Sequence, residues 1–263
     1  MRVLIRAAGI LGPGLRDWNS SLPVLRGQTP YRPEPVQLSP VEALPPAERR
    51  RTGPPIRLAL STGLQALASS GLSAADVVTV FASSGGDGQV IHEICEALAT
   101  DQREVSPTRF HNSVHNAPAG YWGIATRAHA ASTSLCAFDW SFAAGLLEGC
   151  AQVVTTAQPV LIVSYDVPYP EPLDRARSLQ DTLGVALVLS PAESNGAGTT
   201  LEVKVSPLPQ SVTKMRDPEL EKLRNGNPSG RALPLLEALA SGVQREIALE
   251  YLDGTLLLHT LTA

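Results

Sequence analysis

Three short, nearly continuous apolar runs most constrain what this chain can fold into. They lie at residues 77–82, 159–165 and 185–190, and they are rich in Val, Ile and Leu. Runs without polar alternation are typical of strands buried on both faces, as in parallel or mixed sheets. Segments with helical spacing lie between them. We therefore expect an α/β fold, a mostly parallel or mixed sheet with helices packed on it.

Other segments extend this pattern. Strands are predicted at residues 3–10, 131–137 and 201–205, and the last is expected to pair beside the strand at 185–190. The predicted helices are 56–70, 89–99, 117–130 and 141–150. Trp122 and Ile124 should be buried in the third helix. Ala143, Ala144 and Gly145 in the fourth should allow it to approach the sheet closely.

Two segments differ from the rest. Residues 16–55 contain nine prolines, which remove backbone donors and predict an extended loop with a short helix near 45–51. An arm that embraces a partner is the alternative. The tail carries a short helix at 233–239 and a hairpin around Asp253-Gly254. We divide the chain into a main part, 1–206, and a short helix-hairpin extension, 207–263, packed on the same domain.

Composition excludes several classes of function. Charged residues make up 17% of the chain and the net charge is −4, which gives no electrostatic case for nucleic acid. Cys95, Cys136 and Cys150 match no zinc spacing, so we expect reduced, mostly buried thiols, no metal and a cytoplasmic protein. The apolar N-terminus is too short to span a membrane. The low charge also suggests that a partner covers part of the surface.

Two stretches resemble the centre of a β-ketoacyl synthase. They are SPTRFHNSVHNAPAG at 106–120 and ASTSLCAFDWSFAAGLLE at 131–148. In that family a small-residue helix leads to a strand, and a sharp turn then holds the nucleophilic cysteine at a helix start. PVLIVSYD and LGVALVLSP look like the two strands that follow. The resemblance puts Phe138 at the nucleophile position, and a phenyl ring cannot attack a thioester.

The resemblance implies a thiolase-like fold, of which residues 1–205 match the N-terminal half only. The second half, which supplies the catalytic histidines, has no counterpart, and His259 is the only later histidine. The chain is similar to the short chain length factors of aryl polyene pathways. Such a factor pairs with an active, full-length ketosynthase, shapes its acyl tunnel and meets acyl carrier protein through the complex. We expect a non-catalytic subunit without a cofactor.

The same resemblance gives the candidate site. In the family, the strand before the nucleophile pairs across a two-fold axis, and the segment matching 108–116 lines the partner's acyl pocket. Phe138 is therefore expected at the nucleophile-equivalent position. The tunnel or interface candidates are Phe110, His111, Asn112, His115, Asn116, Ser134, Cys136, Asp139, Trp140 and Phe142.

Alternatives remain for individual residues. Cys136 is a candidate nucleophile of an atypical acyltransferase or thioesterase, although its place two residues before Phe138 favours a structural thiol. Asp139 is a candidate catalytic carboxylate, although its place at a helix start favours a cap that matches the helix dipole. The glycine turn at 85–88 fits no phosphate-binding fingerprint and predicts a tight turn. A homodimer that binds acyl ligands is the other alternative for the whole chain.

Overall fold

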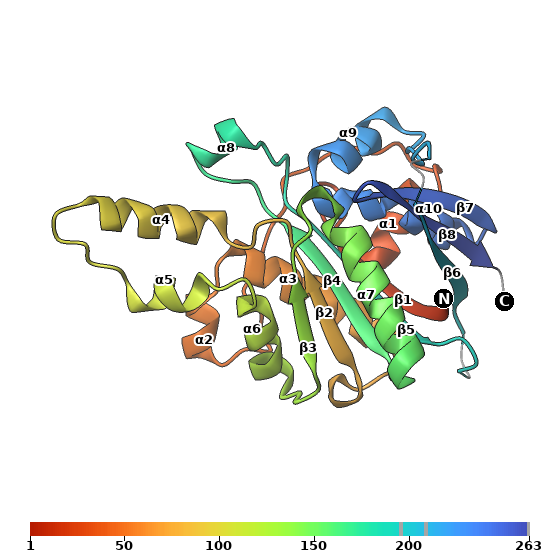
Figure 1. Cartoon of the computed structure of the whole chain (residues 1–263), viewed down its shortest axis with the longest axis horizontal. Helices are drawn as coiled ribbons and strands as arrows, with labels where there is room; N and C mark the ends of the chain where they lie inside the picture. Colours follow the sequence, from red (N-terminus) through yellow and green to blue (C-terminus); the bar gives the residue numbers. More distant parts are fainter. Residues whose placement is uncertain (195–196, 208–209, 262–263) are drawn as a thin grey trace.

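The computed structural model describes residues 1–194, 197–207 and 210–261. Within them, an eight-stranded sheet has the order β3-β2-β4-β5-β1-β6-β8-β7 (Figure 1). β2 pairs in parallel with β3 and β4, and the other pairs are antiparallel, so the mixed sheet is confirmed. The strands are β1 (Arg2–Leu11), β2 (Val78–Ala82), β3 (Ser132–Leu135), β4 (Val160–Asp166), β5 (Leu183–Pro191), β6 (Thr199–Ser206), β7 (Arg245–Tyr251) and β8 (Gly254–Leu261).

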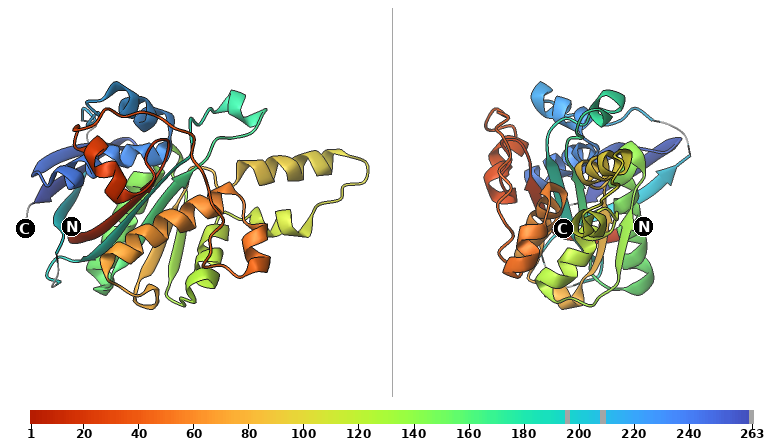
Figure 2. Two further views of the ribbon diagram at one scale, coloured as in Figure 1. Left: turned by 180° about the vertical axis from the view of Figure 1, so that it is seen from behind. Right: turned by 90° about the vertical axis from the view of Figure 1, so that its left-hand side faces the viewer.

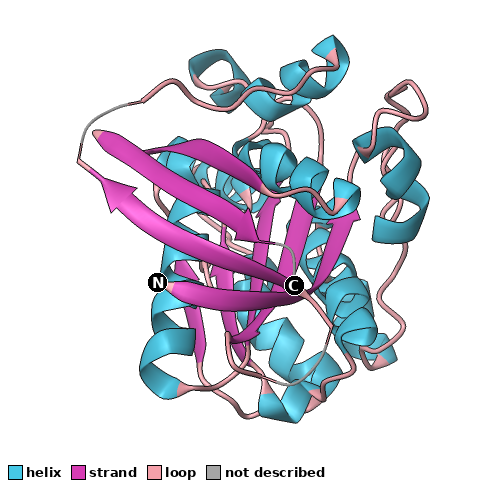
Figure 3. Ribbon diagram, turned by 90° about the vertical axis from the view of Figure 1, so that its right-hand side faces the viewer, coloured by secondary structure: helices cyan, strands magenta, loops and turns pink. Residues whose placement is uncertain are grey.

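Helices cover both faces of the sheet, and each face has its own hydrophobic core (Figures 2 and 3). α3 (Pro54–Ser70) and α6 (Ala117–Thr126) pack on one face, and α7 (Ser141–Thr156) and α10 (Leu233–Ser241) on the other. The remaining α-helices are α1 (Trp18–Leu25), α2 (Pro46–Arg51), α4 (Gly88–Ala99), α5 (Pro107–Asn112), α8 (Leu173–Ala176) and α9 (Pro218–Gly226). No helix in the described ranges is both long and apolar enough to cross a bilayer.

The apolar runs became the centre of the sheet. Every residue of β4 is buried, as is every residue of β5 before Pro191. Two-sided burial explains why these strands show no polar alternation. The tail forms α10 and the β7–β8 hairpin, as predicted, and the hairpin extends the same sheet through β6. Both parts of the chain share one sheet and one hydrophobic core, so no boundary is visible at residue 206. The division there stays a prediction.

Several details of the sequence prediction were wrong. The strand at 199–206 pairs with β1 and β8 instead of β5, because β1 lies between β5 and β6. Ile124 is 43% exposed, whereas Trp122 is buried. α6 is apolar all round, so its pattern does not specify which side faces the sheet. Cys95 and Cys136 are exposed, and only Cys150 is buried; burial raises the pKa of Cys150 to about 12.

The proline-rich segment contains a helix that the sequence analysis missed. Asp17 caps α1 by accepting a hydrogen bond from the Ser20 N–H at 2.9 Å. Pro23 lies inside this helix, where proline is normally excluded. The many prolines of the segment therefore predicted a loop where the helix forms. The short helix near 45–51 is confirmed as α2.

α4 and α5 form an arm that projects from the body of the molecule beside the β3 edge (Figures 1 and 2). An ion pair between Arg109 and Glu93 joins the two helices. Gly88 is the only buried residue of α4, although one side of this helix carries Ile91 and Leu98. The arm therefore leaves apolar surface uncovered.

Candidate functional site

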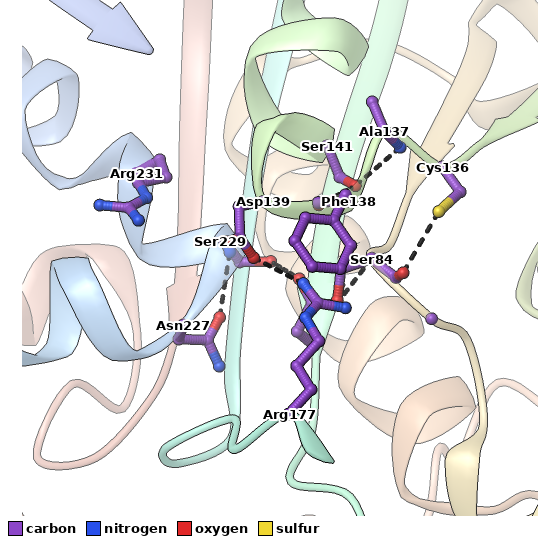
Figure 4. Close-up of polar contacts among 12 residues, drawn as sticks. Ser84, Cys136, Ala137, Phe138, Asp139, Ser141, Arg177, Asn227, Ser229 and Arg231 are labelled. Atoms are coloured by element: carbon purple, nitrogen blue, oxygen red, sulfur yellow. Dashed lines mark hydrogen bonds and ion pairs between the residues drawn. The ribbon is translucent and has the colours of Figure 1, made fainter. Parts of the chain in front are cut away.

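The chain turns sharply between the end of β3 and the start of α7. Phe138 lies at this turn with a φ of 53°, in the left-handed region that bulky side chains rarely adopt. The Ser141 hydroxyl accepts a hydrogen bond from the Ala137 N–H at 3.0 Å and donates one to the Phe138 carbonyl at 2.7 Å (Figure 4). The resulting elbow presents the phenyl ring, and Phe138 is 51% exposed.

Close packing of α7 fixes where the elbow lies. A Cβ on Gly145 would lie 2.9 Å from the Cβ of Ala82, and one on Gly149 would lie 2.5 Å from Cδ1 of Ile162. Real Cβ atoms do not approach so closely, so larger residues would push the helix away from the sheet. The prediction that small residues allow close approach is confirmed for Gly145.

Cys136 does not occupy the elbow position. Its Sγ donates a hydrogen bond to the carbonyl oxygen of Ser84 at 3.2 Å. That contact uses the protonated thiol, whereas a nucleophile needs the thiolate. In the described part of the chain, no histidine, lysine or arginine is hydrogen-bonded to Cys136.

An arginine from the segment between β4 and β5 covers the elbow ring. The Arg177 guanidinium carbon lies 3.8 Å from the centroid of the Phe138 ring, and Nη2 is 2.6 Å from Oδ1 of Asp139 (Figure 4). The expected capping role of Asp139 is wrong, because α7 has no side-chain cap and Asp139 instead pairs with Arg177. Sequence analysis missed Arg177, which lies 38 positions from Asp139.

The glycine turn at 85–88 seats a second residue of this segment. A Cβ on Gly85 would overlap the Tyr169 hydroxyl, and one on Gly88 would lie 2.5 Å from the Tyr169 ring. Arg177 Nη1 donates to the Tyr169 hydroxyl at 3.3 Å. The tight turn is as expected, and Asp87 caps the helix that follows. Gly85 and Gly88 of this turn leave the space that the Tyr169 ring fills.

A buried carboxylate lies behind the elbow. Asp166, at the end of β4, accepts hydrogen bonds from the Ser84 N–H at 2.8 Å, the Ser84 hydroxyl at 2.7 Å, the Ser83 hydroxyl at 3.2 Å and the Ser229 hydroxyl at 2.9 Å. Burial raises the pKa of this carboxyl, and the four donors oppose that shift. Asp166 thereby joins the ends of β2 and β4 to the turn at 228–232.

The segment upstream of α6 reaches the residues that follow β2. His115 Nε2 lies 3.1 Å from the Ser83 carbonyl oxygen. Asn112 is buried; it donates to the Arg51 carbonyl at 2.8 Å and accepts from the Tyr121 hydroxyl at 3.1 Å. His111 is exposed, edge to face with Tyr121 at 6.2 Å between centroids. His115 and Cys136 thus contact adjacent residues, Ser83 and Ser84.

An apolar groove runs along this upstream segment. Phe110 is 69% exposed and Val114 is 53% exposed. Together with Asn116 and Ile124 they line a groove of about 510 Å³. The candidates therefore form two groups, one along the groove and one around the elbow.

The last three candidates lie at or behind the elbow. The Trp140 ring is 6.4 Å from the Phe138 ring, so these two aromatics are neighbours. Phe142 is 1% exposed and belongs to the core beneath α7. Ser134 lies on the edge strand β3 opposite Phe81. No group of three or more His, Cys, Asp or Glu among the described residues could hold a metal ion.

Comparison with protein families gives a single assignment. The model of the β-ketoacyl synthase N-terminal domain matches residues 24–250. The chain belongs to this family. The resemblance seen in the sequence is therefore confirmed. A comparison with curated proteins found no match.

Solved structures share the fold over most or all of this chain. One is a ketosynthase, ApeO, in complex with its chain length factor, ApeC, from Xenorhabdus doucetiae; the match has 22% identity, a TM-score of 0.73, and covers 98% of this chain and 99% of that one. Another is the complex AntDE:AntF, a type II polyketide synthase carrier protein with its ketosynthase, at 13% identity, TM-score 0.76, and 100% and 99% coverage. A β-ketoacyl synthase from Burkholderia phymatum matches at 13% identity and TM-score 0.60, covering 92% of this chain and 71% of that one. The thiolase-like fold predicted from the sequence is thus confirmed.

Proposed function

We propose that this chain is a non-catalytic chain length factor. It pairs with an active, full-length ketosynthase in polyketide-type elongation of the aryl polyene kind and shapes the acyl tunnel. One observation carries the proposal: Phe138 occupies a strained elbow at the place where the family resemblance puts the nucleophile. A phenyl ring has no lone pair to attack a thioester. The partner then supplies the chemistry, and this chain supplies the wall.

The open edge of the sheet supports a partner at β3. The carbonyl oxygens of Ala131 and Leu135 accept hydrogen bonds from β2. Successive residues of a strand point to opposite sides, so the N–H and C=O of Ser132 and Ser134 face the open edge. An exposed edge of this kind is a template for a strand of another chain. A ketosynthase strand would continue the sheet.

Uncovered apolar surface beside that edge supports the same partner. The exposed large hydrophobics of the arm and of α6 are Ile91, Leu98, Phe110, Val114 and Ile124. When exposed apolar residues gather on one part of a surface, that part usually binds a partner protein. Two of the similar solved structures are ketosynthase complexes. We expect an interface of about 2,000 Å² or more in total.

No specific observation favours the two alternatives. The Cys136 thiol donates its hydrogen bond to the Ser84 carbonyl, which is typical of a cysteine with a structural role and does not favour a nucleophile. An acyl-binding homodimer would use the same edge and groove. Measuring the size of the purified chain, alone and with a ketosynthase, separates the homodimer from the heterodimer.

Reconstitution tests the proposal. The chain is co-expressed with a ketosynthase encoded beside it and with acyl carrier protein, and the complex is isolated on a tag carried by this chain. We expect a one-to-one complex that forms product, and no product from this chain alone with acyl- and malonyl-carrier protein. Product from the chain alone that disappears in Cys136→Ala would contradict the proposal. So would a stable monomer whose cooperative unfolding is unaffected by the ketosynthase.

A further inference from the structure

The elbow ring is held by contacts that come from another part of the chain. The Arg177 guanidinium lies over the Phe138 ring at 3.8 Å, and Asp139 binds the same guanidinium at 2.6 Å. The Arg177 side chain is 20% exposed and that of Asp139 is 41% exposed. A planar cation over an aromatic face is attracted by the ring quadrupole, and partial burial strengthens that attraction.

Arg177 itself is held in place from below. Its Nη1 donates to the Tyr169 hydroxyl at 3.3 Å. The Tyr169 ring fills the space that Gly85 and Gly88 leave open. The guanidinium therefore has three neighbours that fix its plane: a carboxylate, a phenol and the phenyl ring it covers. Figure 4 shows Arg177 reaching up to Phe138 and Asp139.

We infer that Arg177 is the positioning residue of the elbow: it holds the Phe138 ring in one orientation and so fixes the surface that the elbow presents. Because the guanidinium covers one face, Phe138 keeps a single exposed side. The effect on acyl chains rests on the proposed function. There, a ring with one orientation stops a growing chain at one depth, whereas a ring free to rotate stops chains at several depths.

Fluorine NMR tests the positioning step without any activity. 4-Trifluoromethylphenylalanine placed only at position 138 gives one ¹⁹F resonance, in the chain or in its complex. We expect Arg177→Met, which keeps an unbranched, flexible stem but removes the guanidinium and its charge, to shift and broaden this resonance. Arg177→Lys keeps the charge but loses the planar stack, so it should restore the resonance only in part. A resonance that is unchanged in both variants would overturn the inference.

Arg175→Met is the matched control. Arg175 lies two positions away, pairs with Glu171 at 2.7 Å, and its side chain is 79% exposed. The Arg175→Met variant removes an arginine from the same segment that does not contact the elbow, so the ¹⁹F resonance should not move. Equal shifts in Arg175→Met and Arg177→Met would mean that the whole segment is disturbed, and the specific role of Arg177 would be wrong.

Product lengths test the consequence in the reconstituted complex. We expect Arg177→Met to widen the distribution of polyene lengths, and to add no further change when Phe138 is already replaced by Ala. A shifted ¹⁹F resonance with an unchanged length distribution would keep Arg177 as the positioning residue. That result would show instead that the elbow does not gate length, which counts against the proposed function alone.

Discussion

Phe138 keeps a backbone conformation that its own side chain disfavours. A non-glycine residue in the left-handed region costs about 1–2 kcal/mol, and Phe138 adopts a φ of 53°. The bonds of Ser141 to Ala137 and Phe138 and the Arg177 stack offset that cost. The elbow geometry is thus retained although the residue it presents is not a nucleophile.

The strain predicts an unusual order of stability. Phe138→Gly should be more stable than Phe138→Ala by about 1 kcal/mol, because glycine adopts positive φ without a Cβ clash. Urea unfolding of the two variants measures the difference. In the helix just beyond, Ala144→Gly should instead destabilise by about 0.5–1 kcal/mol. If Phe138→Gly were the less stable of the pair, the strain at the elbow would not exist.

The residues of the site differ in how far sequence could reveal them. Phe138 and Cys136 could be assigned to the turn from the sequence because the strand, turn and helix start are consecutive, and the equivalence of Phe138 to the nucleophile position stays a prediction. Asp139 was misread as a cap, since its partner lies 38 positions further on. Arg177 and Tyr169 carry no local pattern. Their roles arise only when the segment after β4 folds over the elbow.

The segment between β4 and β5 depends on the glycine turn at its base. Gly88→Ala should displace the Tyr169 ring, because the new Cβ would lie 2.5 Å from it. We expect faster amide hydrogen exchange across residues 167–182, measured by mass spectrometry. Gly120→Ala in α6 is the control: a Cβ there meets nothing within 4 Å, so exchange in that segment should stay as in the wild type. Unchanged exchange in Gly88→Ala would show that Tyr169 does not anchor the segment.

The edge strand β3 allows a test of the proposed interface. Ser134→Pro removes an N–H that faces the open edge, while the bonds between β3 and β2 use the neighbouring residues. We expect the chain to fold as before but to bind the ketosynthase at least about tenfold more weakly, as one lost interface hydrogen bond plus a clash implies. Ser134→Ala keeps the N–H and should bind normally. Equal affinities for the two variants, measured by calorimetry, would place the interface elsewhere.

The elements that sequence predicted best are those with the strongest local pattern. β4 and β5 are apolar along almost their whole length, and burial on both faces explains why. The strand order was less accessible, because β1 inserts between β5 and β6 through pairings about 190 residues apart. α1 was missed because its proline is tolerated inside a two-turn helix.

The proposed tunnel is a property of the assembled complex. If the groove is part of the proposed tunnel, Phe110→Ala should shift the products of the reconstituted pair toward longer polyenes, because the exposed ring that lines the groove would then block a growing chain. Overpacking by a methylene or two already costs about 1–3 kcal/mol, so sterics outweigh the small gains from added wall contacts. Mass spectrometry of the products measures the shift. Val205→Ala, an equally apolar exposed site on β6, should leave product lengths unchanged.

An unchanged distribution for both Phe110→Ala and Phe138→Ala, with the complex still formed, would contradict length gating. The chain would then act as a scaffold that stabilises the ketosynthase. Complex formation is followed by size-exclusion chromatography, so that loss of assembly is not mistaken for loss of gating.

The two edge strands of the sheet, β3 and β7, differ in whether the chain itself occupies their outer backbone groups. At the outer side of β7, Thr213 donates its N–H to the Ala248 carbonyl at 2.9 Å and accepts the Ala248 N–H at 3.0 Å. Thr213 thus occupies the outward-facing backbone groups of one residue in the middle of β7, with its N–H and its side-chain hydroxyl. Subunits with two open edges add head to tail without limit and form filaments. Under the pairing proposed at β3, this cover on Ala248 disfavours a second strand addition at the β7 edge, so we expect the assembly to stop at a pair instead of extending into a filament.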